Sequence, residues 1–487
     1  KLKGELTGLY QSIMGVVVAV VAGVFALGAR AASFHAGPAV MISFLIAAIV
    51  CGAAVRCYAE FASMIPVAGS AYTFTYTTVG EIMAWIIGWD LILEMLMAGS
   101  VISKYWGVYL NDFMRLMGWN ANTNLTFGSF HIDIAPIIIV AFFTTLLVFG
   151  TKIGARVDGA MTVLKIAIVF FVVIVGFFYV KASNFTPFIP PSQPASTVEG
   201  SSAVTGVMTQ PLWQFATGMT PSVYGVPGIL SGAALVFFAF IGFDVVATAS
   251  EETKNPHKNV PLGIGVGMLL IIVMYMLVAV VTTGLVSYAD LAKQDSPSLA
   301  TAFELVGADW AAQIISFGIV LGLATVVMVL LLGLTRIVFA MSRDGRLPSG
   351  LSKTGKPGTP AALQIVVGAV VALVAAFFDI GVLSDMVNIG TLSAFTLVAI
   401  SIPIMRKKRP DLPRAFKMPG SPWIPILIAV ANFWLMLNLS VLTWIRFVVW
   451  LVVGFAIYFG YGYWHARLGK GDLTETLSAE TDKAVNG

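Results

Sequence analysis

The stretch FFAFIGFDVVATASEE, residues 237–252, has features that a simple membrane-spanning helix lacks. It is apolar and aromatic at first, but Gly242 interrupts it and Asp244 follows two positions later. Glycine lowers the cost of leaving helical geometry by roughly 1 kcal/mol per residue relative to alanine. A helix that unwinds here leaves backbone N–H and C=O groups free inside the membrane. The stretch therefore predicts an interrupted membrane helix.

The rest of the chain has the composition of an integral membrane protein. Of its 487 residues, 58% are hydrophobic and only 11% are charged. A soluble domain cannot bury that much apolar surface, so the lipid bilayer is the expected solvent for most of the chain. A helix of about 20 apolar residues spans the hydrocarbon core. Runs of that length predict twelve spans, near residues 12–29, 38–62, 81–110, 132–150, 158–180, 229–250, 261–284, 309–341, 361–379, 386–405, 423–440 and 443–463.

Basic residues indicate how these spans are oriented. Most of the 28 lysines and arginines fall near the two ends of the chain and between alternate spans. Cytoplasmic loops carry such an excess, so both termini are expected on the cytoplasmic side of the plasma membrane. Residues 181–228, rich in Pro, Ser, Thr and Gly, are then a long outer loop with a short helix near residues 211–219. Residues 287–310 are expected to form a second outer loop that contains short helices.

Several classes of function do not fit this pattern. The net charge of +4 follows from the basic inner loops, so no nucleic acid partner is expected. Cys51 and Cys57 are separated by about 240° around a helix and do not share a face. The four histidines are scattered and show no metal-ligand spacing. Without a nucleophile–base pair or a phosphate-binding loop, the sequence predicts no enzyme, no metal and no cofactor.

Two predicted spans carry a glycine at corresponding places, Gly23 in the first and Gly242 in the sixth. A repeat of five spans is inserted upside down relative to its partner, which is the inverted symmetry of many secondary transporters. Free N–H groups and a helix N-terminus suit a carboxylate, and free carbonyls suit an ammonium group. An amino acid carries both groups, so the pattern predicts an amino acid site between these spans.

Four longer blocks resemble a known family. They are AGPAVMISFLIAAIVCGAAVRCYAEFASMIPVAGSAYTFTYTTVGEIMAWIIGWDLILE (36–94), FFAFIGFDVVATASEETKNPHKNVPLGI (237–264), TRIVFAMSRDGRLP (335–348) and DMVNIGTLSAFTLVAISIPIMRKKRPDLPRAFKMP (385–419). In order and spacing they resemble the amino acid–polyamine–organocation superfamily, and they are most similar to the cationic amino acid transporter-like permeases of bacteria.

The resemblance implies an all-α integral membrane protein with the LeuT-like fold. That fold has 12 transmembrane helices in a 5+5 inverted repeat, with helices 1 and 6 unwound at the midplane and two additional helices. The whole chain is then one transport domain. Its parts are the first repeat (1–180), the outer loop (181–228), the second repeat (229–410), helices 11 and 12 (420–465) and a cytoplasmic tail (466–487).

The resemblance also implies where an L-amino acid binds. Its carboxylate meets backbone N–H groups of the first span, and its ammonium meets backbone carbonyls of the sixth, with Phe238 or Phe240 as an aromatic lid. Glu94 either lines the cavity or hydrogen-bonds the cytoplasmic half of the bundle, while Leu330 contacts the substrate side chain. The N–H groups belong to Ala22, Gly23 and Val24 in the first span. The carbonyls belong to Phe238, Ala239 and Ile241 in the sixth, with Ala19 of the first span as a further group for the ammonium. The alternative for Gly23 is a glycine that lets two helices pack closely.

Charged residues within the spans receive roles of three kinds. Lys165 resembles the fifth-span lysine whose protonation replaces sodium in sodium-independent relatives. A proton is therefore the expected coupling ion. The alternative is a lysine whose side chain snorkels to the membrane surface. Asp244 is expected to tie the unwound sixth span to its neighbours. Glu60, Arg336 and Asp344 either pair to close an inner gate or satisfy local backbone groups. Asp90 is expected to make a polar contact between helices.

Three hypotheses for the function remain open. The first is a proton-coupled, sodium-independent amino acid importer, and the apolar surroundings of Leu330 favour neutral substrates over cationic ones. The second is an antiporter or facilitator that needs no coupling ion. The third is an amino acid sensor that binds without transport, which Val17 and Val21 favour because the family has glycine there and β-branched residues resist unwinding. A small membrane partner is left open.

Overall fold

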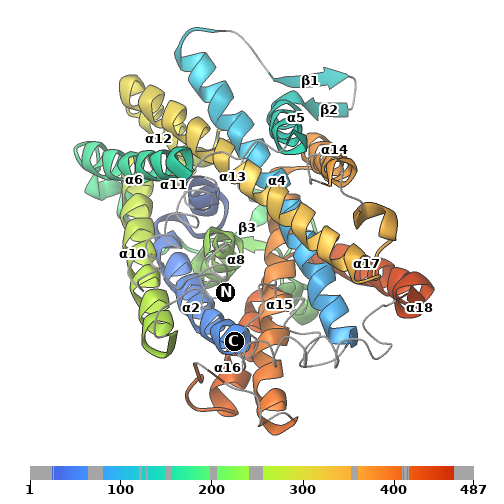
Figure 1. The fold of residues 1–487 in the computed structure, drawn as a ribbon. Helices are drawn as coiled ribbons and strands as arrows, with labels where there is room; N and C mark the ends of the chain where they lie inside the picture. The colour runs from blue at the N-terminus through green and yellow to red at the C-terminus, as the bar shows by residue number, and fades with distance from the viewer. Residues whose placement is uncertain are drawn as a thin grey trace.

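The computed structural model describes residues 23, 25, 27–63, 81–119, 123–127, 130–149, 155–197, 206–240, 256–294, 296–352, 360–408, 410, 414 and 416–465. Within these residues the protein is almost entirely helical, as predicted (Figure 1). The principal helices are α2 (Val40–Ser63), α4 (Glu81–Leu116), α5 (Ile134–Val148), α6 (Ala155–Phe177), α8 (Gly225–Val236), α10 (Pro256–Leu285), α13 (Asp309–Arg343), α14 (Ala361–Phe377), α15 (Ile380–Lys408), α16 (Trp423–Leu437) and α17 (Val441–Ile457).

Six helices among the described residues are long and apolar enough to cross a membrane, and five shorter apolar helices accompany them. Each predicted span from 38–62 to 443–463 overlaps one of the apolar helices, and the sixth, 229–250, is described only as far as Phe240. The first apolar stretch, Leu27–Glu60, is broken by a π-helical turn (Ala32–Ala36) and a 3-10 turn (Gly37–Ala39) before α2 begins. Glycine and proline in the 3-10 turn account for the interruption.

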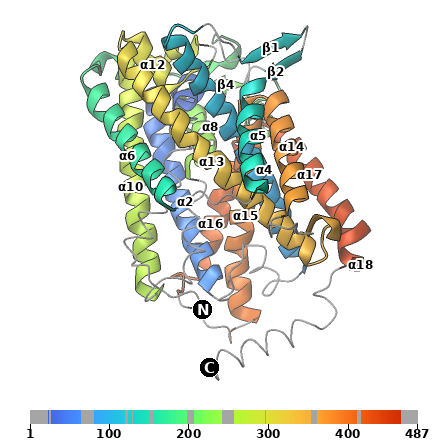
Figure 2. The same cartoon turned by 45° about the horizontal axis from the view of Figure 1, so that its top comes forward.

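Small elements gather at one end of the bundle, which Figure 2 shows at the top and which we call the hairpin end. There β1 (Asn124–Phe127) pairs antiparallel with β2 (Phe130–Asp133), and β3 (Gln193–Pro194) pairs with β4 (Ser222–Val223). The predicted short helices are confirmed: α7 (Leu212–Thr217) lies in the first expected loop, and α11 (Tyr288–Ala292) and α12 (Leu299–Leu305) lie in the second. These two strand pairs were not predicted.

The helices pack around α4, which contacts α5, α13, α14 and α15 (Figure 1). On the other side of the bundle, α2 packs against α8, α10 and α15. Close approach depends on small residues, as is usual for membrane helices. At Gly318 of α13, for example, an added Cβ would lie 2.2 Å from a side-chain carbon of Ile168 in α6. The bundle thus brings the sixth predicted span, which contains α8, between α2 and α15.

Candidate substrate-binding site

The first and sixth predicted spans meet at Gly23 and Ala239. A Cβ atom added to Gly23 would lie 1.9 Å from the Cα of Ala239 and 2.3 Å from its Cβ, whereas ordinary contacts are 3.4–4 Å. Only a residue without a side chain permits this approach of two backbones. The structure therefore brings together two of the residues that were predicted to hold the substrate from opposite sides.

The sixth span changes its helical form at the predicted interruption. The α-helix α8 ends at Val236 and continues as a 3-10 turn over Phe237–Phe240, all four residues of which are buried. A 3-10 turn has poorer hydrogen-bond geometry than an α-helix and often marks a functional break. The change of form begins before Gly242, which itself lies outside the described residues.

Side chains from neighbouring helices bind the carbonyls of the 3-10 turn. Tyr275 of α10 donates its hydroxyl to the Ala239 carbonyl at 2.5 Å, and its ring packs edge-on against Phe240 with 5.2 Å between the centroids. The Cys51 thiol lies 3.9 Å from the Phe240 carbonyl. A carbonyl oxygen has two lone pairs, so the Ala239 carbonyl can still accept a hydrogen bond from an ammonium group. Sequence reasoning missed Tyr275, and a tyrosine inside an apolar span was the only signal for it.

Two further buried side chains hold the ends of these segments. Tyr109 of α4 donates to the Phe25 carbonyl at 2.6 Å and accepts from the Leu299 N–H at 3.3 Å, so it links the first span to α12. Asn388 of α15 donates to the Leu235 carbonyl in the last turn of α8 at 3.0 Å. Neither residue was predicted, because each acts on a backbone group far away in the chain.

The predicted residues on α4, α6 and α13 have different surroundings. Lys165 is 7% exposed, on a helix that packs against α10 and α13, so its side chain faces protein. Glu94 is buried where α4 meets α15, with its N–H 3.8 Å from a Cβ added to Gly390. Leu330 of α13 is half-buried against α4. A Cβ added to Gly99 of α4 would lie 3.9 Å from the Cβ of Leu330.

Asp90 makes the expected polar contact between helices. The Ser393 hydroxyl of α15 donates to Asp90 Oδ2 at 2.8 Å. Asp90 belongs to α4, so the contact joins the central helix to α15 one turn away from Glu94.

Five predicted residues cannot be located, since they lie outside the described residues: Ala19, Ala22, Val24, Ile241 and Asp244.

An ion pair with a buried carboxylate lies at the end of the bundle opposite the hairpin end. Glu60 of α2 is fully buried and accepts from Arg406 Nε at 2.9 Å and Nη2 at 2.6 Å, in bidentate geometry. The Met418 N–H donates to the same carboxylate at 2.6 Å. The sequence analysis grouped Glu60 with Arg336 and Asp344, which both lie near the end of α13. In the structure, Asp344 lies beside Arg343 at 3.3 Å and Arg336 is exposed.

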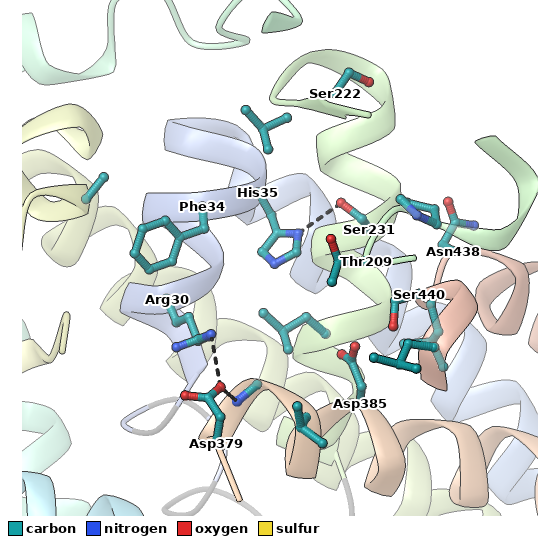
Figure 3. A pocket seen from close by; sticks show the side chains of 18 of the residues that line it. Arg30, Phe34, His35, Thr209, Ser222, Ser231, Asp379, Asp385, Asn438 and Ser440 are labelled. Atoms are coloured by element: carbon teal, nitrogen blue, oxygen red, sulfur yellow. Dashed lines mark hydrogen bonds and ion pairs between the residues drawn. The ribbon is translucent and has the colours of Figure 1, made fainter. Parts of the chain in front are cut away.

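A cavity of about 660 Å³ opens between loops at the hairpin end (Figure 3). Its walls come from the first span, β4, α8, α15 and α17. Arg30 forms an ion pair with Asp379 at 3.8 Å across it, and His35 Nδ1 lies 3.0 Å from the Ser231 hydroxyl. Leu235 also lines the cavity, so the cavity reaches to about one helical turn from Ala239. Loops distant in sequence form it, and sequence reasoning did not find it.

Comparisons with known proteins place the chain in a family. A profile of the amino acid permease family matches residues 9–461. The branched-chain amino acid permease BcaP of Bacillus subtilis (strain 168) is 41% identical over 477 residues, which are 96% of this chain and 95% of that protein. The methylthioribose transporter of the same organism is 37% identical, over 96% of this chain and 95% of its own length. The mitochondrial cationic amino acid transporter 3 of Arabidopsis thaliana is 36% identical, over 83% of this chain and 63% of its own length.

These relatives are transporters by name, as expected for a helical membrane chain with no enzymatic pattern. The match extends over nearly the whole chain. The chain therefore belongs to the amino acid permease family and is a membrane transporter, not an enzyme.

Proposed function

We propose that the protein is a secondary active transporter of L-amino acids in the plasma membrane that works by alternating access. The contact of Gly23 with Ala239 is the main support for this proposal. It joins the first and sixth spans through their backbones at the point where α-helical geometry ends in the sixth. Backbone amides and carbonyls at such a junction can hold the carboxylate and the ammonium of one amino acid.

The two ends of the bundle support alternating access. At the hairpin end the 660 Å³ cavity reaches Leu235, close to the crossing. At the opposite end the Glu60–Arg406 pair ties α2 to α15 and to the segment at Met418. With both termini on the cytoplasmic side, this arrangement corresponds to an outward-facing state. The pair at Glu60 would break, or move as a unit, when the inner end opens.

For the substrate we propose neutral L-amino acids first and cationic ones second. One relative is named for branched-chain amino acids and another for cationic amino acids. The side chains near Leu330 are apolar, and an apolar lining disfavours a charged side-chain head. We further propose that Lys165 carries the coupling proton, because this amine is buried within the bundle, on a helix that packs against α10 and α13.

Transport by purified protein in liposomes tests this function and separates it from its alternatives. Uptake of labelled L-leucine and L-arginine is measured with and without an imposed pH gradient, in the absence of sodium. A proton symporter accumulates substrate only with the gradient. An exchanger needs amino acid inside the liposome instead, and a sensor binds substrate without flux. Uptake that depends on sodium, or no binding of any amino acid, would overturn the proposal.

A further inference from the structure

Three tryptophan side chains join α17 to the central helix α4. Trp85 and Trp89 are four residues apart in α4 and therefore share a face of that helix. The Trp89 ring stacks on the Trp85 ring with 5.7 Å between the centroids, and on the ring of Trp450 in α17 with 4.4 Å. The interplanar angles are 12° and 17°, so the three rings are nearly parallel. The stack thus bridges the two helices.

The indole N–H groups fix the two backbones against each other. Trp85 Nε1 donates to the Gly454 carbonyl at 3.1 Å, and Trp89 Nε1 donates to the Trp450 carbonyl at 2.8 Å. In the opposite direction, Trp450 Nε1 donates to the Trp89 carbonyl at 3.3 Å. Gly454 permits this approach, because an added Cβ would lie 2.5 Å from the Trp89 ring. We call Trp85, Trp89, Trp450 and Gly454 the indole seam.

The indole seam anchors a helix at the edge of the bundle, where Figure 2 shows α17. One face of α17 is exposed, through Val448, Val449, Val452 and Val453. In a membrane, a helix gains little from burying apolar side chains against a neighbour, because lipid is equally apolar. Close packing and hydrogen bonds to the neighbouring helix therefore decide where α17 lies.

The indole seam holds the turn of α4 that carries two of the predicted residues. Trp89 directly precedes Asp90, and Glu94 follows one turn later. The carbonyl that accepts from Trp450 belongs to the peptide that joins Trp89 to Asp90. The same turn also contacts α15: a Cβ added to Gly390 would lie 3.6 Å from the Asp90 carbonyl oxygen and 3.8 Å from the Glu94 nitrogen. Contacts with α17 and with α15 therefore fix the position of this turn together.

We propose that the indole seam positions α4 for substrate binding, by holding the turn at Asp90 and Glu94 in place. Its members are positioning residues, which act on the substrate through α4 and not by contact. The inference rests on the proposed function in that Glu94 lines a cavity for an amino acid. It goes further by giving α17, which follows the helices of the two predicted repeats, a part in setting the affinity for substrate.

Uptake of labelled L-leucine by the full chain in liposomes tests this inference, with initial rates corrected for the amount of folded protein. Trp450→Phe keeps an aromatic ring but removes the N–H group that binds the Trp89 carbonyl. Gly454→Ala places a methyl group against the Trp89 ring. Each change is expected to raise the half-saturation concentration roughly 10-fold, the worth of about one hydrogen bond, and to leave the maximal rate within about two-fold.

Two matched controls make the same changes away from the indole seam. Trp444→Phe alters another half-buried tryptophan of α17, whose N–H group donates to the Met436 carbonyl of α16 at 2.9 Å. Gly460→Ala lies in the π-helical turn Tyr458–Gly462, where an added Cβ would meet none of the described residues within 4 Å. Both variants should keep the wild-type half-saturation concentration.

A seam that only stabilised the fold would change the amount of active protein and its thermal unfolding midpoint, but not the half-saturation concentration. If both seam variants keep the wild-type half-saturation concentration, or if the controls raise it equally, the positioning role is refuted while the proposed transport function stands. If Gly454→Ala does not fold, Trp450→Phe alone decides. If wild-type protein shows neither binding nor uptake of L-leucine or L-arginine, the proposed function itself is refuted.

Discussion

Replacing Gly23 by alanine should abolish transport, although glycine-to-alanine changes usually favour a helix. The added Cβ would lie 1.9 Å from the Cα of Ala239, and ordinary contacts begin at 3.4 Å. The first and sixth spans must therefore separate by about 1.5–2 Å to admit one methyl group. Helix propensity alone would stabilise the variant by roughly 1 kcal/mol. Overpacking costs about 1–3 kcal/mol, so we expect a net loss of stability.

The effect on transport should be larger than the effect on stability. Donors and acceptors from both spans bind one ligand, and a displacement of about 1 Å in such a constellation costs on the order of 100-fold. Initial rates of L-leucine uptake into liposomes, measured beside the thermal unfolding midpoint, separate the two effects. We expect the uptake rate to fall at least about 100-fold while the protein remains folded.

Gly28→Ala provides the control, because it makes the same change five residues further along the segment. Among the described residues, a Cβ on Gly28 would meet only the Phe44 ring, at an ordinary 3.8 Å. This variant should transport nearly as well as the wild type. If Gly23→Ala transports like Gly28→Ala, the two backbones do not need their close contact, and the reasoning about the substrate site is wrong.

Three more substitutions probe the surroundings of the site. Tyr275→Phe removes the hydroxyl that binds the 3-10 turn. We expect thermal unfolding to show about 1–3 kcal/mol of destabilisation, and uptake to have a raised half-saturation concentration. If both values are unchanged, Tyr275 does not have this role. Arg406→Gln removes the bidentate partner of the fully buried Glu60 carboxylate and should cost about 3–5 kcal/mol. Glu60→Gln should cost at least as much, because it takes the carboxylate from two arginines, Arg406 and the buried Arg414, whose Nε lies 3.7 Å from Glu60. A smaller loss of stability for Glu60→Gln than for Arg406→Gln in chemical denaturation would contradict this. Lys165→Gln should abolish the stimulation of uptake by a pH gradient but spare the exchange of internal for external substrate. Lys181→Gln is the control, because Lys181 is exposed, and it should change neither activity. Gradient-driven uptake by the Lys165 variant would exclude the proposed proton role.

Local pattern explains the parts of the structure that were predicted correctly. Apolar runs of about 20 residues can only be helices in lipid, because every backbone polar group must be bonded within the segment. Gly23 and the residues around Ala239 were recognisable because a break in a membrane helix needs glycine or an equivalent defect. The short helices α7, α11 and α12 followed from loop composition and length.

The residues that were missed act over long distances in the sequence. Tyr275 and Asn388 each donate to a backbone carbonyl of the sixth span, and a donor of this kind leaves no mark near its acceptor. Glu60 was recognised as a charged residue at the inner end, but its partner Arg406 lies 346 positions away. The cavity at the hairpin end is lined by several helices and loops that are distant in sequence, so no single stretch contains its pattern.

The order of apolar and polar residues by itself determined that this chain is helical and membrane-bound, because lipid permits few other ways to bond the backbone. It also predicted a break in the first span and in the sixth, and the structure shows the change of helical form in the sixth. Tertiary packing decided which charges pair, which carbonyls are bound and where a cavity opens, because these depend on distances between helices. The contact at Gly23 depends on both, because the sequence pattern identified the glycine and only packing placed it against Ala239.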